Sequence, residues 1–568
     1  MRRGVLIALA LAALAAVAVA LSLAPLSPGE QLRVVGTYTI NALAVSSSGG
    51  GAVVPIEVTL LTPGNGRAYV AGVPEAGEGF GPSAQIALYV ASRLAGVSPS
   101  NYTALIRVKA LQSSVGGPSA SGYITAALFA LMKGLPLRND TAMTGIILPD
   151  GTIGWVGGVQ YKVEAAAQNG IKYVLVPLGE QGEAAGVSGV EVIPIATIQQ
   201  AIYYLTGYNV TSPYNASSLN PAVFDNVSRE LYEEVLAIYE NATGPSASQY
   251  ANMSQIEALA ASGQYYVAAS LLYSSLVNYY DGLVSRGSAN SSALYNEALS
   301  LAKEYESVVK KIPITSNNLG IIIGLYERIY QVYQEANSSS PDVGLMYARV
   351  VTLPPWIDAA RELAYGRAVN ESALADMAEA YLQYAYVMYS YVETTYGSQL
   401  PSQYVAQLDQ SFGLAQSLYS AGHYLAALAA SLDTIAFSEN LLAAPGADSL
   451  VGVERQVALQ NAYRAAACGS PDILPLSYIQ LGDYYNGSDN VTALYLYESA
   501  SMYAAAIGDI LCSPGPAYEV TYSPPPSVSV PAPPLRLSSS PQSAMDYIAP
   551  AVILAFAISV AVIMLKKR

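Results

Sequence analysis

The chain has 568 residues, of which 52% are hydrophobic and only 12% are charged, and it carries 45 Tyr against 6 Phe. This length allows two or three domains, each with a core of its own. The net charge is −15 and the sequence holds no basic stripe interleaved with aromatic residues, so we expect no nucleic-acid partner.

Several residue types that common enzymes depend on are scarce. His423 is the only histidine, and it occupies a helix corner where a similar phrase has Gln264, which favours a surface or packing role. One histidine and two distant cysteines argue against a metal site. The sequence contains no Gly-x4-Gly-Lys-Ser/Thr phosphate loop. We therefore expect no metal, no cofactor and no ATP. A catalytic serine would need a base other than histidine, and lysine is the remaining choice, because burial can lower its pKa toward neutrality and leave a free amine.

The first 24 residues resemble a targeting segment. Arg2 and Arg3 precede an uninterrupted apolar run in which Ala18-Val19-Ala20 forms a small-residue cleavage site. The run is also long enough to remain in a membrane. Residues 1–24 are thus predicted to be a signal peptide or a signal anchor.

Residues 33–208 are predicted to form an α+β domain, because strand-forming and helix-forming segments are mixed along this region. A hairpin over 142–156 turns at Pro149-Asp150-Gly151. The predicted strands are 33–45, 52–61, a short strand within 62–72, 103–111 and 172–177, and the predicted helices are 83–96, 119–134 and 160–170.

The tetrapeptide Gly-Pro-Ser-Ala occurs three times and raises the question of which serine is reactive. Ser83 and Ser246 each open a helical stretch and are predicted to be helix-start residues. Ser119 differs, because it follows a strand and the turn Gly116-Gly117-Pro118. It also begins a small-residue helix whose N-terminal amides can stabilise an oxyanion.

Five motifs in order around Ser119 resemble the proteolytic domain of Lon protease, a serine–lysine peptidase family. They are GGPSASG (116–122), AMTG (142–145), GGVQYK (157–162), NGIK (169–172) and YVLVP (173–177). The lysine of the third motif follows the serine of the first by 43 residues, which matches the family's spacing. The resemblance covers about residues 33–205.

The resemblance implies a site. The residues that match are Ser119 as nucleophile, Lys162 as general base, Thr144 as the residue that orients the lysine, and Gly117, Pro118 and Ala120 as the turn around the nucleophile. Taken singly, Ser119 is better explained as a helix cap and Lys162 as a solvated helix residue. Their order and spacing together favour the dyad.

The sequence departs from the family in three respects. Glycine stands where many members carry an acidic residue near the serine, and Ile146 follows Met-Thr-Gly in place of a glutamate. These changes leave the dyad intact but affect how the site is gated. The family's ATP-driven unfolding module has no counterpart in the sequence. Because Lon peptidase domains form rings, the resemblance also suggests a homo-oligomer.

Residues 222–512 are predicted to be entirely helical, as a bundle or a degenerate repeat array. Two segments, 262–276 and 421–435, share a phrase in which glycine and tyrosine precede paired alanines. Cys468 and Cys512 are the only cysteines. They either form one disulfide or remain two unrelated thiols.

The C-terminal residues carry a second membrane signal. The Pro/Ser-rich segment 513–545 is predicted to be an extended stalk before a transmembrane helix over 546–565. The basic tail 566–568 is expected in the cytoplasm, and the positive-inside rule leaves the bulk of the chain outside it. Frequent Asn-x-Ser/Thr sequons agree with that placement.

The sequence therefore predicts a membrane-anchored, extracytoplasmic, ATP-independent serine endopeptidase that acts on peptides or on unfolded or flexible protein segments. One alternative is a non-catalytic cell-envelope scaffold in which the helical domain binds partners and the peptidase fold is inert. A third hypothesis is autoprocessing alone, with a single cleavage in the chain itself.

Overall fold

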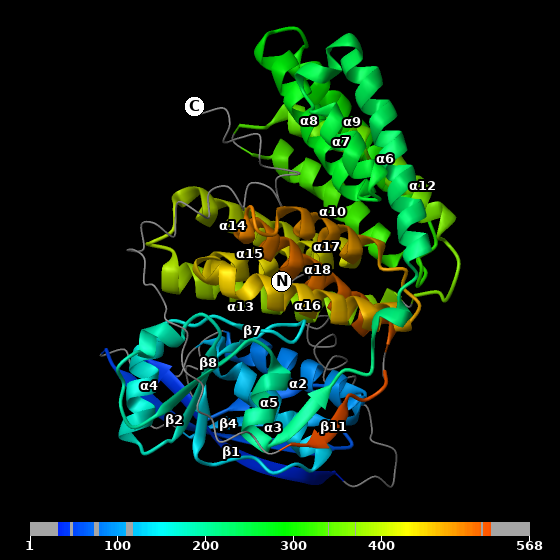
Figure 1. Cartoon of the computed structure of the whole chain (residues 1–568). Coiled ribbons are helices and arrows are strands. Elements are labelled where there is room, and N and C mark those ends of the chain that lie inside the picture. Colours follow the sequence, from blue (N-terminus) through cyan, green and yellow to red (C-terminus); the bar gives the residue numbers. More distant parts are fainter. Residues whose placement is uncertain are drawn as a thin grey trace, which may run out of the picture.

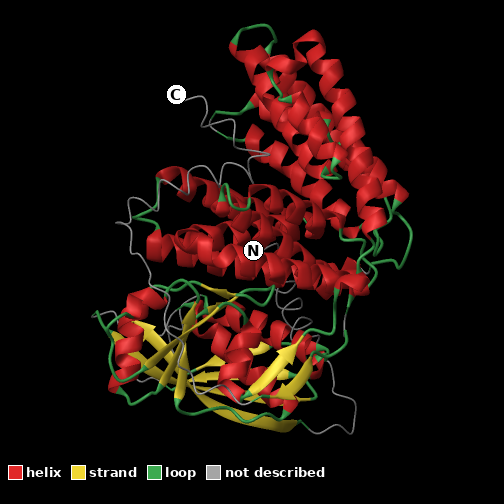
Figure 2. Cartoon of the chain, viewed as in Figure 1, coloured by secondary structure: helices red, strands yellow, loops and turns green. Residues whose placement is uncertain are grey.

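The computed structural model of the chain describes residues 32–45, 49–72, 79–109, 117–338, 340–369, 371–512 and 515–523. The predicted signal or anchor, the predicted transmembrane helix and the basic tail lie outside the described residues, as do 524–545 of the predicted stalk. Figure 1 shows a sheet-containing layer at one end of the molecule and helices stacked on it. Figure 2 shows that the strands are confined to that layer.

The α/β domain (residues 33–211) is built on a mixed sheet with the order β3-β4-β2-β1-β5-β8-β9. The pairs β1–β2 and β2–β4 are antiparallel, whereas β3–β4, β1–β5, β5–β8 and β8–β9 are parallel. The strands are β1 (Arg33–Val45), β2 (Gly51–Thr62), β3 (Ala68–Ala71), β4 (Thr103–Val108), β5 (Thr141–Met143), β8 (Tyr173–Pro177) and β9 (Glu191–Ile195). The predicted mixture of strands and helices is confirmed.

In the described part of this domain, four α-helices accompany the sheet. Helices α2 and α3 pack on each other, while α3 and α4 both pack on β1 and β2. Gly96 adopts a left-handed φ of 67° and ends α2, in agreement with the end of the helix predicted over 83–96. The helices are α2 (Phe80–Ala95), α3 (Ser121–Lys133), α4 (Val159–Gln168) and α5 (Ile198–Thr206).

A hairpin projects from the sheet toward the helical part of the molecule. It consists of β6 (Ile146–Ile147) and β7 (Ile153–Gly154), and Asp150 in its turn accepts hydrogen bonds from the amide and hydroxyl of Thr152. The hairpin turns where the sequence predicts it. It links β5 to α4.

Residues 221–511 form the helical domain. Helices α13, α15, α16 and α18 face the α/β domain, and α6 to α9 lie on the far side (Figure 1). The helices are α6 (Pro221–Thr243), α7 (Met253–Ala261), α8 (Tyr265–Ser285), α9 (Ser291–Val309), α10 (Leu319–Ala336), α11 (Val343–Val351), α12 (Pro354–Glu362), α13 (Glu371–Tyr396), α14 (Ser402–Ser420), α15 (Tyr424–Ala443), α16 (Ala447–Ala467), α17 (Ile473–Tyr485) and α18 (Asn490–Leu511).

Within the described residues, one run, Tyr424–Ala467, is long and apolar enough to cross a membrane. Its apolar window is completely buried inside the protein, in the α15–α16 region. Burial of this kind is typical of a core helix. The run is distinct from the two membrane segments predicted at the ends of the chain.

The chain returns to the α/β domain after α18, which corrects the predicted start of the stalk. Strand β11 (Glu519–Tyr522) pairs antiparallel with β10 (Tyr208–Thr211), and the amide of Tyr518 donates to the carbonyl of Leu94. The alternating Glu-Val-Thr-Tyr suits an edge strand, although prolines flank it. Residues 519–522 of the predicted stalk are therefore part of the folded protein.

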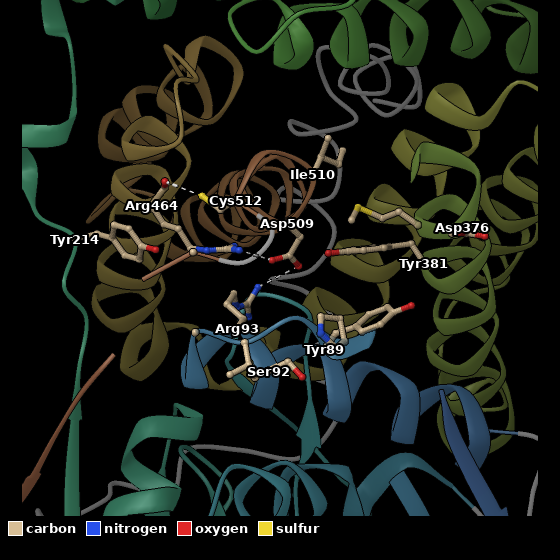
Figure 3. A pocket seen from close by; sticks show the side chains of 15 residues that line it. Tyr89, Ser92, Arg93, Tyr214, Asp376, Tyr381, Arg464, Asp509, Ile510 and Cys512 are labelled. Carbon is tan, nitrogen blue, oxygen red and sulfur yellow. Dashed lines mark hydrogen bonds and ion pairs between the residues drawn. The ribbon is translucent and has the colours of Figure 1, made fainter. Parts of the chain in front are cut away.

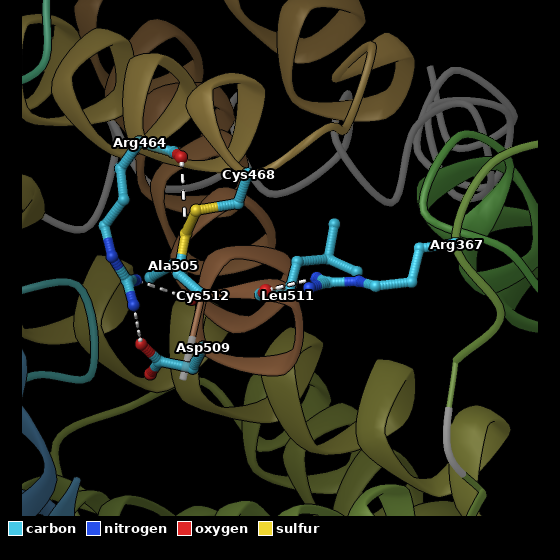
Figure 4. Close-up of a disulfide and its surroundings, with 7 residues drawn as sticks. All are labelled: Arg367, Arg464, Cys468, Ala505, Asp509, Leu511 and Cys512. Atoms are coloured by element: carbon cyan, nitrogen blue, oxygen red, sulfur yellow. Dashed lines mark hydrogen bonds and ion pairs between the residues drawn. A yellow bond between two sulfur atoms is a disulfide. The ribbon is translucent and has the colours of Figure 1, made fainter. Parts of the chain in front are cut away.

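Cys468, at the end of α16, and Cys512, at the end of α18, are joined in a disulfide with Cα atoms 5.5 Å apart (Figure 4). In the same corner, Asp509 bridges Arg464 at 2.7 Å and Arg93 of α2 at 3.5 Å (Figure 3). These groups border a cavity of about 300 Å³ between the two domains. The disulfide thus fixes the helix end that carries an interdomain ion bridge.

Candidate active site

Ser119 lies in a single 3₁₀ turn, Pro118–Ala120, that leads into α3. Gly117 precedes it with a φ of 100°, a conformation that favours glycine. Ser119 is half-buried, and its carbonyl accepts hydrogen bonds from the Gly145 amide at 2.8 Å and the Thr144 hydroxyl at 3.5 Å. The nucleophile turn predicted from the sequence is therefore in contact with the Ala-Met-Thr-Gly motif.

The other two copies of the tetrapeptide have structural roles. Ser83 is in the first turn of α2, where it is buried, and its hydroxyl donates to the carbonyls of Gly79 and Phe80. Ser246 is not at a helix start. It lies in the 3₁₀ segment Gly244–Gln249 that follows α6, and it donates to the carbonyl of Thr243. The helix-start prediction was thus wrong for Ser246.

Thr144 directly follows β5 and is fully buried. Its amide donates to the carbonyl of Leu175 in β8 at 3.0 Å, while its hydroxyl contacts Ser119 as described above. The Thr144 hydroxyl thus hydrogen-bonds to the nucleophile turn. Its predicted role in orienting Lys162 stays a prediction.

Lys162 is in the first turn of α4, and its side chain is almost inaccessible, with a residue exposure of 3%. Burial lowers the pKa of Lys162 to about 8, although nearby Glu180 and Glu183 act in the opposite direction. A lysine with a pKa this close to neutrality retains a substantial fraction of free amine. It has the property that a general base requires.

Two glutamates that sequence reasoning missed lie at the start of the lysine helix. Glu180 accepts a hydrogen bond from the amide of Val156 at 3.0 Å, and Glu183 lies close to the backbone of Val159. Both glutamates follow β8 in the sequence, and β8 is also the strand whose Leu175 carbonyl accepts the hydrogen bond from Thr144. Burial raises the pKa of Glu180 well above its usual value. No local motif identified them.

The helical domain also reaches this region. The amide of Gly157 donates to the hydroxyl of Tyr391 at 2.7 Å, and the hydroxyl of Tyr384 donates to the carbonyl of Ile147. Both tyrosines belong to α13, more than 230 residues further along the chain. The segment between Thr144 and Lys162 is therefore held by both domains.

His423 lies at the start of α15, half-buried, with its ring centroid 5.7 Å from that of Tyr330 in α10. This is the packing role that the sequence favours. In the part of the chain that the structure describes, no group of three or more His, Cys, Asp or Glu side chains is arranged to hold a metal ion.

Comparisons with known proteins agree with the motifs. Residues 27–201 match the family model of the Lon protease (S16) C-terminal proteolytic domain. A Lon protease of Phenylobacterium zucineum is 37% identical over 164 residues, which are 27% of this chain and 20% of that protein. A Lon protease of Fervidobacterium nodosum is 39% identical over 132 residues, 22% of this chain and 16% of that protein. An archaeal Lon protease of Thermococcus kodakarensis is 29% identical over 170 residues, 29% of this chain and 26% of that protein.

The matched region is the α/β domain, and the chain spans only 16% to 26% of the length of these three relatives. The comparisons support a Lon-type serine peptidase domain, as the sequence motifs predict. They do not extend to the helical domain.

Proposed function

We propose that the chain is an ATP-independent, membrane-anchored serine endopeptidase in which Ser119 is the nucleophile and Lys162 the general base. The observation that carries this proposal is the combination of a half-buried serine on a glycine-preceded turn and a buried lysine with a pKa of about 8. These residues match the Lon-type motifs in order. We further propose that the Lys162 amine comes within hydrogen-bond distance of the Ser119 hydroxyl.

In the proposed reaction, Lys162 Nζ takes the proton of the Ser119 hydroxyl as Ser119 Oγ attacks the scissile carbonyl carbon. The tetrahedral intermediate collapses, the C–N bond breaks, and the ammonium of Lys162 returns the proton to the leaving amine. The amine of Lys162 then deprotonates a water that attacks the acyl-enzyme. The C–O bond to Ser119 breaks and the proton returns to Ser119.

The oxyanion of that intermediate needs hydrogen-bond donors. The amides of Ser121 and Gly122 already donate to the carbonyls of Pro118 and Gly145. We therefore assign the oxyanion to the amides of Ser119 and Ala120.

We place the catalytic part of the chain outside the cytoplasm. The apolar segments 1–24 and 546–565, with their flanking positive residues, support anchoring. The Cys468–Cys512 disulfide supports an oxidising compartment. Vesicles with the chain in its native orientation test this topology, because protease added outside should remove the helical domain if that side is extracytoplasmic.

Substrates are proposed to be peptides and unfolded or flexible protein segments, because the sequence has no phosphate loop that would power unfolding. We propose that the peptidase domain spans residues 33–208 and the helical domain residues 222–512. We also propose a homo-oligomer, and this rests only on the resemblance to Lon peptidase domains. Light scattering of the detergent-solubilised chain tests the oligomer.

The test is degradation of casein by the full chain in detergent without ATP. Wild type should release peptides, whereas Ser119→Ala and Lys162→Ala should lower the rate by about 100-fold or more. Ser246→Ala is the matched control, since it alters the same tetrapeptide outside the site, and it should behave as wild type.

The alternatives give different results. Full activity in Ser119→Ala would overturn the dyad. A folded wild-type chain with no Ser119-dependent cleavage of any substrate would favour the scaffold hypothesis. A single cut in the chain itself, absent from Ser119→Ala and without casein degradation, would restrict the activity to autoprocessing.

A further inference from the structure

One side of helix α13 lies along the segment that connects Thr144 to Lys162 and also contacts Gly79 at the start of α2. The residues that make these contacts are spaced by three, four and four positions, which places them on one face of a helix. Over this spacing the face extends about 16 Å. The contacts are Tyr384 with Ile147, Val387 with Gly79, Tyr391 with Gly157, and Thr395 with Gly157.

The hydrogen bond from Gly157 to Tyr391 is next to the lysine helix. Gly158 is the N-cap of α4, and the amide of Lys162 donates to its carbonyl to form the first helical bond. Amides at and just before the start of a helix have no partner within the helix. The Tyr391 hydroxyl provides that partner for Gly157.

Two neighbouring backbone amides at this turn are therefore bound by side chains from different domains. Val156 is held by Glu180 of the α/β domain. Gly157, the next residue, is held by Tyr391 of the helical domain. These bonds fix the direction of the first turn of α4. They therefore fix the position of the Lys162 Cα atom, from which the side chain extends.

Close packing supports this role of α13. A Cβ atom on Gly157 would lie 3.1 Å from Thr395 Cγ2, so glycine allows the helix to approach the turn. Further along the same face, a Cβ on Gly79 would lie 3.1 Å from Val387 Cγ1 and 3.8 Å from Pro118 Cδ. The helix thus borders both the lysine turn and the surroundings of the nucleophile turn.

We propose that α13 of the helical domain is a positioning element of the peptidase site, and that Tyr391 holds the turn from which Lys162 projects. This assigns the helical domain a direct part in assembling the site, whatever else it binds. The inference rests on the proposed function for its kinetic consequences. Its structural content, the placement of Lys162, is measurable independently.

The test is Tyr391→Phe in the full chain, which removes the acceptor and keeps the ring. We expect kcat for a flexible peptide substrate to fall at least about tenfold with KM nearly unchanged, because lysine placement acts on chemistry more than on substrate binding. The acidic limb of the pH profile should move to higher pH, since a loosened turn exposes Lys162 to water. Tyr389→Phe is the matched control, because that hydroxyl is on the same helix but donates to Asp409 at 2.8 Å.

A second measurement separates this inference from the proposed function. The titration of Lys162 is followed by NMR of chain labelled with ¹³C at lysine Cε, with the signal assigned through Lys162→Arg. A higher Lys162 pKa in Tyr391→Phe, with wild-type thermal unfolding, supports the positioning role even if no hydrolysis is found in wild type. Unchanged kcat or an unchanged Lys162 titration in a folded Tyr391→Phe chain would overturn it.

Discussion

Glu439 of α15 is in direct contact with Gly154 of β7: a methyl group on Gly154 would lie 2.7 Å from Glu439 Oε2. Glu439 is only 4% exposed, and it lies close to the backbone of Trp155. The negative charge of nearby Asp150 also disfavours ionisation of Glu439. Burial raises the pKa of Glu439 to about 8. The interface next to the lysine turn thus contains a buried carboxyl that stays protonated at neutral pH.

This carboxyl predicts that the protein is more stable in acid. In the unfolded chain Glu439 loses its proton near pH 4.5, whereas the folded protein keeps it to about pH 8. The folded state therefore binds more protons between these values, and the free energy of unfolding falls as pH rises through that window. Glu439→Gln does not titrate and keeps the size of the side chain. It should be more stable than wild type by about 2–4 kcal/mol at pH 8.

Denaturant unfolding of both chains at pH 4.5 and pH 8 measures the effect. The two chains should differ little at pH 4.5, because Glu439 is protonated there in the folded state. A variant that is less stable than wild type at pH 8 would contradict a protonated Glu439.

The second prediction concerns activity and pH. Protonated Lys162 cannot act as a base, so kcat/KM should rise about tenfold per pH unit and level off near pH 8, the value to which burial lowers the pKa of Lys162. Because the charge of Glu180 raises that pKa, Glu180→Gln should move the acidic limb to lower pH. Glutamine keeps the acceptor for the Val156 amide.

The pH profile of peptide hydrolysis checks this shift. Glu164→Gln is the control, since Glu164 is also on α4 but contacts Gln160 at 2.9 Å. An acidic limb that moves to higher pH in Glu180→Gln would contradict the predicted effect of its charge.

Sequence patterns predict those parts of the fold that local rules determine. The strands predicted over 33–45 and 52–61, the helix predicted over 83–96 and the Pro149–Gly151 turn all follow from neighbouring residues, and the structure has them. The family motifs single out Ser119 and Thr144 separately, and the folded structure joins them through the hydrogen bond from the Thr144 hydroxyl to the Ser119 carbonyl.

The remaining features depend on contacts between distant parts of the chain. Tyr391 is one of 45 tyrosines, and nothing near it in the sequence relates it to Gly157, 234 residues earlier. Glu180 follows a strand in a loop and has no motif of its own. Residues 519–522 are flanked by prolines, so composition indicates a linker, and only pairing with β10 makes them a strand.

The third prediction tests the turn before Lys162. Gly158 has a φ of 69°, and a Cβ there would lie 2.7 Å from Val45 Cγ2. Gly158→Ala should lower the free energy of unfolding by about 2–3 kcal/mol, since it combines left-handed strain of about 1–2 kcal/mol with that close contact. It should also reduce peptidase activity, because α4 must shift.

Gly170, at the other end of α4, provides the control. Its φ is 73°, but a Cβ there has no atom within 4 Å in the described structure. Gly170→Ala should therefore lose only about 1 kcal/mol and retain activity. Equal loss of activity in both variants would show that any alanine beside an end of α4 has the same effect, and that the close contact at Gly158 is not the cause.

The fourth prediction concerns the disulfide between Cys468 and Cys512. Their separation of 44 residues means that the bond closes a long loop in the unfolded chain, and its removal should lower the free energy of unfolding by about 4 kcal/mol. Denaturant unfolding of Cys468→Ser/Cys512→Ser measures this loss. Wild type with a reducing agent should approach the same midpoint, while the reducing agent should leave the double variant unchanged.

Because Asp509 lies three residues before Cys512 and bridges Arg464 to Arg93, the variant should also expose the junction between the domains to protease earlier than wild type. If the variant unfolds at the wild-type midpoint, the bond contributes nothing to stability.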